Sequence, residues 1–135
     1  MTLAYPVSIK GVLLVEWKVL LVRNDRNEWE LPGGRLENGE THAQTLVREF
    51  TEELAIDVEP LEFIGAYDFE VIPSRHVHIV TYGCRLRGQF APALSAEHKA
   101  FGLYAIDDLG LIPLPAGYAR SIRSWSAQLK PTSTA

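Results

Sequence analysis

The sequence is poor in cysteine, has no long apolar run and carries no excess of positive charge, and each of these scarcities argues against a class of protein. With Cys84 as its single cysteine, the chain cannot form an internal disulfide, which fits a reducing compartment. The longest apolar stretch, residues 11–22, contains Glu16 and Lys18 and is too short and too polar to cross a bilayer. The net charge of −4 disfavours a general nucleic-acid or membrane-surface binder.

The N-terminal segment has no basic residue before Lys10, so it lacks the charged start and apolar run of a signal peptide. We therefore expect a cytoplasmic protein. Of the 135 residues, 47% are hydrophobic and 22% are charged, which is the composition of a folded globular protein. This length predicts one domain over residues 1–130, and the small polar residues 131–135 predict a disordered tail.

Short apolar segments alternate with glycine and proline turns along the chain, and they predict both strands and helices. Thr41 followed by Gln44 forms a capping-box pattern, and the apolar residues after it recur at helical spacing up to Leu54. We expect strands at Val7–Val15, Lys18–Arg23, Trp29–Leu31, Leu61–Val71, His76–Leu86 and His98–Ile106, and helices from the Thr41 cap to Leu54 and at Tyr118–Leu129. Strands before, between and after helices predict an α/β fold with a mixed sheet.

The first of these helices carries a crowd of carboxylates. Glu49, Glu52 and Glu53 fall within an arc of roughly 100° on the helix surface, and Arg48 is the one cation beside them. Like charges at this spacing repel one another. Either this side of the helix is a solvated acidic surface supported by an Arg48–Glu52 ion pair, or divalent cations compensate it. Oxygen-rich sites of the second kind suit Mg²⁺ or Mn²⁺.

The glycine pair before the helix bears on this choice. Gly33 and Gly34 follow Pro32, and they permit backbone dihedrals and close approaches that other residues do not. A backbone carbonyl in this turn could reach the acidic side of the helix as a further oxygen ligand. The alternative is a plain turn in a segment that happens to be acidic.

From Gly34 to Ile56 the sequence is GRLENGETHAQTLVREFTEELAI. It resembles the Nudix box, GX5EX7REUXEEXGU with U apolar, and the preceding LPGG is also typical of the Nudix hydrolase superfamily and its MutT-like members. One position departs from the pattern, because Ala55 stands where the family has glycine. The residue just past a helix often adopts a positive φ, so alanine there is expected to cost of order 1 kcal/mol and to leave the chemistry unchanged.

The resemblance implies an α/β/α sandwich with a mixed sheet. It also implies an enzyme that uses Mg²⁺, with Mn²⁺ as a substitute, to hydrolyse a nucleoside diphosphate linked to another group. The implied metal ligands are the Gly33 carbonyl, Glu49, Glu52 and Glu53, and these three carboxylates together with Arg48 are the implied catalytic residues. Arg48 would orient Glu49 through charge-assisted hydrogen bonds. The implied partner is a small nucleotide, with no nucleic acid and no membrane, and the implied assembly is a homodimer.

Many members of the family add an acidic residue from a later loop, as a metal ligand or as the base. Glu97 in LSAEHKAF, just before the last predicted strand, is our candidate for both roles. The alternative is an ordinary loop glutamate. His98 beside it either assists the chemistry or is a structural histidine.

The substrate remains open at this level. A (deoxy)nucleoside triphosphate is the favoured hypothesis because the chain is short, and ADP-ribose, another nucleotide sugar or a dinucleoside polyphosphate are the alternatives. Two further hypotheses come from other classes: a non-catalytic nucleotide-sensing module, and an isomerase of allylic diphosphates with Cys84 as a protonating group.

Overall fold

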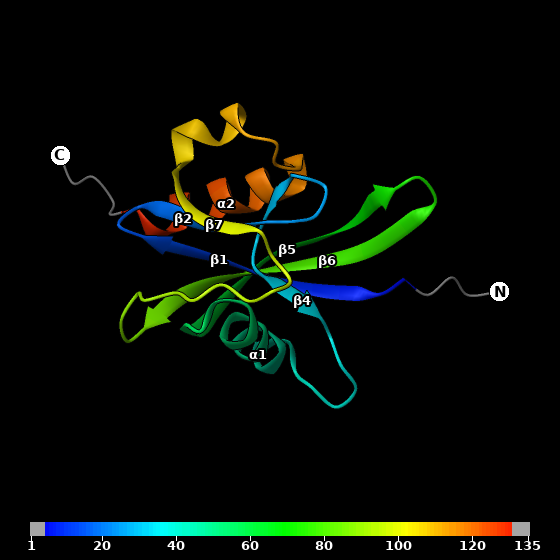
Figure 1. Cartoon of the computed structure of the whole chain (residues 1–135), viewed down its shortest axis with the longest axis horizontal. Helices are drawn as coiled ribbons and strands as arrows, with labels where there is room; N and C mark the ends of the chain where they lie inside the picture. Colours follow the sequence, from blue (N-terminus) through cyan, green and yellow to red (C-terminus); the bar gives the residue numbers. More distant parts are fainter. Residues whose placement is uncertain (1–4, 131–135) are drawn as a thin grey trace.

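Two helices cover opposite faces of a mixed β-sheet in the computed structural model, which describes residues 5–130 (Figure 1). The strands are β1 (Val7–Val15), β2 (Lys18–Arg23), β3 (Trp29–Glu30), β4 (Gly33–Arg35), β5 (Asp57–Ile72), β6 (Arg75–Arg87) and β7 (Ala100–Ala105). The helices are α1 (His42–Leu54) and α2 (Ala116–Leu129), and a 3-10 helix, η1, spans Ile106–Leu111. The predicted α/β/α sandwich with a mixed sheet is confirmed.

Strand β1 is central to the sheet because it pairs with three other strands. It runs parallel to β6 and antiparallel to β2 and β4. Strand β2 also pairs with β3 and β7, and β5 pairs with β6, which completes a seven-stranded sheet. The β1–β4 register sets Lys10 opposite Gly33 and Ile9 opposite Gly34. The first strand therefore fixes the position of the glycine pair.

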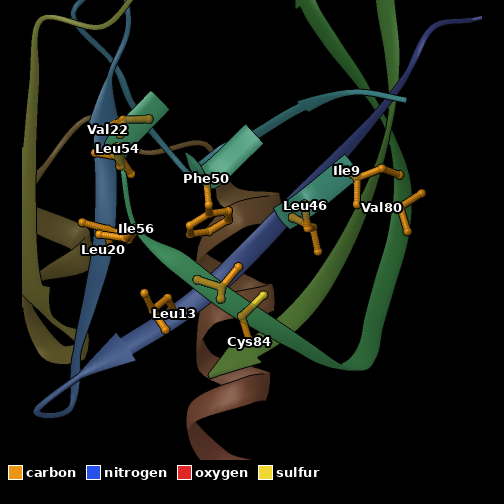
Figure 2. Packing of buried hydrophobic residues seen from close by; sticks show 11 residues of the cluster. Ile9, Leu13, Leu20, Val22, Leu46, Phe50, Leu54, Ile56, Val80 and Cys84 are labelled. Carbon is orange, nitrogen blue, oxygen red and sulfur yellow. The ribbon is translucent and has the colours of Figure 1, made fainter. Parts of the chain in front are cut away.

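The alternation of side chains along the strands divides the core between the two faces of the sheet. On β1, Leu13 belongs to the cluster under α1, whereas its neighbour Val12 belongs to the cluster under α2. Figure 2 shows the first cluster, in which the completely buried Phe50 of α1 packs among residues of β1, β2 and β6. On the other face, α2 contributes Ile122 and Trp125.

The ends of helix α1 are defined by its caps. The Gln44 backbone N–H donates to Thr41 Oγ1 at 3.1 Å, and the Thr41 backbone N–H donates to Gln44 Oε1 at 2.9 Å. The predicted capping box is therefore confirmed. At the other end, Ala55 adopts φ 55° and ψ 34°, the left-handed conformation that favours glycine.

The largest differences between the structure and the sequence-based expectations lie in two places. The expected tight turn at Gly33–Gly34 is part of a short strand, β4, because Gly33–Arg35 pairs with β1. Strand β5 begins at Asp57, well before the expected start, because its pairing with β6 continues to Arg87. The predicted tail, residues 131–135, lies outside the described residues.

Within residues 5–130, no helix combines the length and the apolar character needed to span a membrane.

Candidate active site

Arg48 lies at the centre of the carboxylates on α1 and on the loop before it. Its Nε and Nη2 donate to the two oxygens of Glu40 at 2.6 and 3.0 Å. Its Nη1 donates to Glu49 Oε1 at 3.0 Å and to Glu52 Oε2 at 3.2 Å. The planar guanidinium supplies this fork of donors in a fixed geometry. Arg48 therefore holds Glu49 and Glu52 near each other on one side of the helix.

Glu40 closes the loop that precedes α1. Its Oε1 accepts hydrogen bonds from the Glu37 backbone N–H at 3.2 Å and from Thr45 Oγ1 at 2.9 Å. The hydrogen bond from Arg48, followed by these two, lowers the pKa of Glu40 to about 2. Glu40 is therefore ionised at neutral pH, and both of its oxygens are already engaged in holding the loop.

The glycine pair allows the backbone to approach two carboxylates closely. Gly33 has a φ of 138°, and its N–H donates to Glu53 Oε2 at 3.1 Å. A Cβ on Gly33 would overlap the carbonyl oxygen of Ile9, and a Cβ on Gly34 would overlap the carboxylate of Glu49. Any side chain at these positions would displace either the backbone or Glu49.

Glu53 is a buried carboxylate with an unusually high proton affinity. Its exposed fraction is 3%, and this burial raises its pKa to about 7 although Lys10, His98 and the Gly33 N–H favour the ionised form. Burial also raises the pKa of Glu49 despite the hydrogen bond from Arg48. The charge of Glu52 also raises the pKa of Glu49, and the charge of Glu49 raises the pKa of Glu53. The cations around this pair are therefore not sufficient to ionise both groups easily.

A later loop brings Glu97 to this buried carboxylate. The backbone N–H groups of Ala93 and Ser95 donate to the carbonyls of Leu54 and Glu53, each at 2.8 Å. These carbonyls end α1 and have no partner within the helix, so the loop satisfies them. As a result, one oxygen of Glu97, one oxygen of Glu53 and one ring nitrogen of His98 lie within 4.8 Å of one another.

Two charged residues beneath the site, Lys10 and Glu30, were not expected from the sequence. Lys10 is 7% exposed, and its Nζ donates to the Gly33 carbonyl at 3.4 Å. Burial disfavours ionisation of Glu30, but Lys10 and hydrogen bonds from His98 and Asn24 outweigh it and hold the pKa of Glu30 at about 2. The sequence signal that could have revealed them was Lys10 itself, the single charged residue in the strand VSIKGVLLV.

Two residues named in the sequence-based hypotheses lie apart from this buried cluster. The side chain of Glu52 is 59% exposed, and Arg48 is its described contact. Cys84 is 3% exposed in the core under α1, and burial raises the pKa of its thiol to about 12. A thiol that lies inside the core and holds its proton this tightly is a poor proton donor, which argues against Cys84 as a protonating group and favours its role as a small core residue.

The donors at this site fit a divalent cation. Glu49, Glu53 and Glu97 offer carboxylate oxygens, and the Gly33 carbonyl has a second lone pair beside the one used by Lys10. Crowded carboxylates with raised pKa values are the groups that a cation stabilises most. The set is dominated by hard oxygen atoms, with one imidazole at its edge.

A small cavity opens beside Lys10 on the face of the sheet that α2 covers. Its volume is about 130 Å³. Its charged lining comes from Lys10, Arg26 and Glu30, and its apolar and aromatic walls include Phe69 and Tyr118. Because Lys10 also contacts Gly33, this cavity adjoins the carboxylate cluster.

Comparisons with known proteins agree with this architecture. A family model described as the NUDIX domain matches residues 5–127. The Bacillus subtilis protein YjhB, named as a candidate ADP-ribose pyrophosphatase, is 31% identical over 100 residues, which cover 70% of this chain and 48% of YjhB. An 8-oxo-dGTP diphosphatase from Proteus vulgaris is 47% identical over 51 residues, which cover 36% of this chain and 43% of that protein. The chain thus spans about half or less of these curated relatives.

Among solved structures, a MutT protein from Methanosarcina mazei superposes with a TM-score of 0.79 at 23% identity. The superposition covers 97% of this chain and 99% of that chain. At this level of identity, the similarity shows a shared fold.

Proposed function

The chain belongs to the Nudix family, and from this premise we propose that it is an enzyme that hydrolyses the diphosphate bond of a nucleoside diphosphate linked to another group. The proposed cofactor is Mg²⁺, with Mn²⁺ as a substitute. The proposed ligands are the Gly33 carbonyl and the carboxylates of Glu49, Glu52, Glu53 and Glu97.

One observation carries this proposal: a buried carboxylate of a helix and an exposed carboxylate of a distant loop converge on one position. Glu53 of α1 and Glu97 of the loop before β7 approach within 4.8 Å, although their charges repel. Their pairing is enforced by backbone hydrogen bonds between the loop and the end of α1. A purely structural surface has no need of such convergence, whereas a cation-dependent site does.

The proposed roles follow from these contacts. Arg48 orients Glu49 and Glu52 through Nη1, and Gly34 leaves room for Glu49. A bound Mg²⁺ would neutralise charge on the phosphate oxygens and make water a better nucleophile. A carboxylate of the cluster would accept the proton from the attacking water.

The favoured substrate is a (deoxy)nucleoside triphosphate. The cavity of about 130 Å³ beside the cluster is smaller than the roughly 300–1,000 Å³ of pockets that enclose drug-sized ligands, which suits a single base. The name of the Proteus vulgaris relative agrees with a triphosphate substrate. ADP-ribose or another nucleotide sugar is the second candidate, and the name of YjhB favours it.

A substrate panel tests the proposal. Purified protein would be incubated with and without Mg²⁺ against nucleoside triphosphates, oxidised guanine triphosphates, ADP-ribose, sugar nucleotides and dinucleoside polyphosphates, and the products would be separated. We expect Mg²⁺-dependent cleavage of one class, its loss in Glu53→Gln, and full activity in Glu62→Gln, a matched change at an exposed position of β5. Nucleotide binding without turnover across the panel would favour the sensing module instead.

A further inference from the structure

His98 lies between the partly buried carboxylate Glu30 and the convergent pair Glu53 and Glu97. Its Nε2 is 3.2 Å from Glu30 Oε1, and one of its ring nitrogens is within 4.8 Å of an oxygen of Glu53 and an oxygen of Glu97. The side chain is 9% exposed. The ring is therefore enclosed by carboxylates from β3, from α1 and from its own loop.

The two ring nitrogens have different environments. Nε2 donates its proton to Glu30, whereas Nδ1 is buried and has no hydrogen-bond partner among the described residues. In this tautomer Nδ1 carries a lone pair. A buried lone pair without a partner is costly, which calls for an occupant at this position.

The contacts of Glu30 explain why the ring is held in place. Glu30 Oε2 accepts a hydrogen bond from Asn24 Nδ2 at 3.1 Å, which leaves Oε1 facing His98. Histidines that bind metals usually donate their second ring N–H to a carboxylate, which fixes both the tautomer and the orientation of the ring. Glu30 and His98 already have this arrangement.

We propose that His98 is a nitrogen ligand, through Nδ1, of a divalent ion that Glu53 and Glu97 also bind, and that Glu30 orients the ring. This inference rests on the proposed function in that it uses the same carboxylates. It predicts a mixed oxygen and nitrogen site in place of an all-oxygen one. Imidazole ligands favour later transition metals over Mg²⁺, so His98 should raise affinity for Mn²⁺ and, more strongly, for Co²⁺.

A second histidine–carboxylate pair serves as an internal control. His78 Nδ1 is 2.9 Å from Asp68 Oδ1 across the β5–β6 hairpin, but its side chain is 41% exposed. Within residues 5–130, Glu53, Glu97 and His98 form the one group of three or more such side chains close enough to share an ion. His78→Asn therefore removes a paired histidine that should not bind the ion.

The test detects the metal–nitrogen bond directly, without substrate. Electron spin echo envelope modulation would be recorded on the Mn²⁺-loaded wild-type protein, on the same protein with ¹⁵N-labelled histidine, and on His98→Gln and His78→Asn. We expect a histidine nitrogen coupling that changes frequency with ¹⁵N, persists in His78→Asn and disappears in His98→Gln. Isotope labelling leaves the sequence intact, so this arm holds even if a variant folds poorly.

Calorimetric titration of Co²⁺ and of Mg²⁺ into the metal-free wild-type protein and into metal-free His98→Gln supplies a second readout. His98→Gln should lower Co²⁺ affinity at least about tenfold and Mg²⁺ affinity much less. Absence of nitrogen coupling in the wild-type protein, or its persistence in His98→Gln, would overturn the inference. Hydrolysis without nitrogen coupling would reject the ligand and leave the proposed function standing, whereas coupling without hydrolysis of any substrate would do the reverse.

Discussion

Replacing Ala55 with glycine should stabilise the protein, and the structure allows the size of the effect to be worked out. Ala55 ends α1 with φ 55° and ψ 34°, and its N–H bonds to the Thr51 carbonyl at 3.0 Å. For a residue with a Cβ, this left-handed conformation costs about 1–2 kcal/mol relative to glycine. The methyl group is exposed, so its removal uncovers no buried apolar surface.

Glycine also has a cost, because its unfolded chain has more conformational freedom to lose. This entropic cost is about 0.4–1 kcal/mol. The net expectation for Ala55→Gly is therefore a gain of about 0.5–1 kcal/mol in the free energy of unfolding. One kcal/mol shifts Tm by about 4–8 °C in domains of about 60–100 residues and by about 2–4 °C in domains of about 150–250 residues. The length of this chain lies between these classes, so the expected rise in Tm is about 2–4 °C.

Thermal and urea unfolding in EDTA would measure the effect. Ala43→Gly is the matched control, since Ala43 is an exposed residue in the first turn of the same helix. Glycine there should lower stability by about 0.5–1 kcal/mol, because it gains nothing from a helical φ. A Tm for Ala55→Gly that is unchanged or lower than that of the wild-type protein would refute the reasoning about the left-handed cap.

Three further predictions concern the site itself. Gly34→Ala should displace the Glu49 carboxylate and lower kcat about 100-fold while the protein stays folded, as a steady-state assay would show. Gly65→Ala is the control, because a Cβ there meets open space, and it should leave kcat unchanged. Arg48→Lys keeps the charge but loses the fork that joins Glu40, Glu49 and Glu52, so the free energy of unfolding in urea should fall by about 1.5–3 kcal/mol. In metal-free protein, the pKa of Glu53 is about 7 in the folded state and 4.5 in the unfolded chain. Between these pH values the folded state binds more protons, so the free energy of unfolding should fall as pH rises from 4.5 to about 7. Glu53→Gln should flatten that decline, and a decline equal to that of the wild-type protein would contradict the assignment.

The sequence was sufficient for those features that depend on local periodicity and spacing. The strands Val7–Val15 and Lys18–Arg23 were predicted with their observed bounds, because both are short apolar runs joined by a two-residue turn. The Thr41 cap was predicted because the capping box depends on residues three apart. The carboxylate cluster of α1 was visible for the same reason, since its members lie within two turns of one helix.

What the sequence did not reveal depends on register between distant segments. Lys10 reaches Gly33 because β1 pairs with β4, and neither strand alone indicates that pairing. Glu30 and His98 are far apart in the chain and meet because β3 and β7 both pair with β2. The family resemblance placed Glu97 near the site. The sequence alone did not indicate a role for His98, because that role depends on its contact with Glu30.

Lys10 lies between the carboxylates Glu30 and Glu53, and the different surroundings of these two explain why Glu53 is available to bind a cation. Lys10 lowers the pKa of both Glu30 and Glu53, yet the two differ greatly in pKa. Glu30 accepts side-chain hydrogen bonds from Asn24 and His98, whereas Glu53 accepts one backbone N–H, from Gly33. A carboxylate that is shielded from water ionises readily only when hydrogen bonds and nearby positive charges offset the free energy of its desolvation. For Glu30, the protein itself supplies enough hydrogen bonds and positive charge to stabilise the ionised form. For Glu53 it does not, so a divalent ion would stabilise the ionised form of Glu53 most.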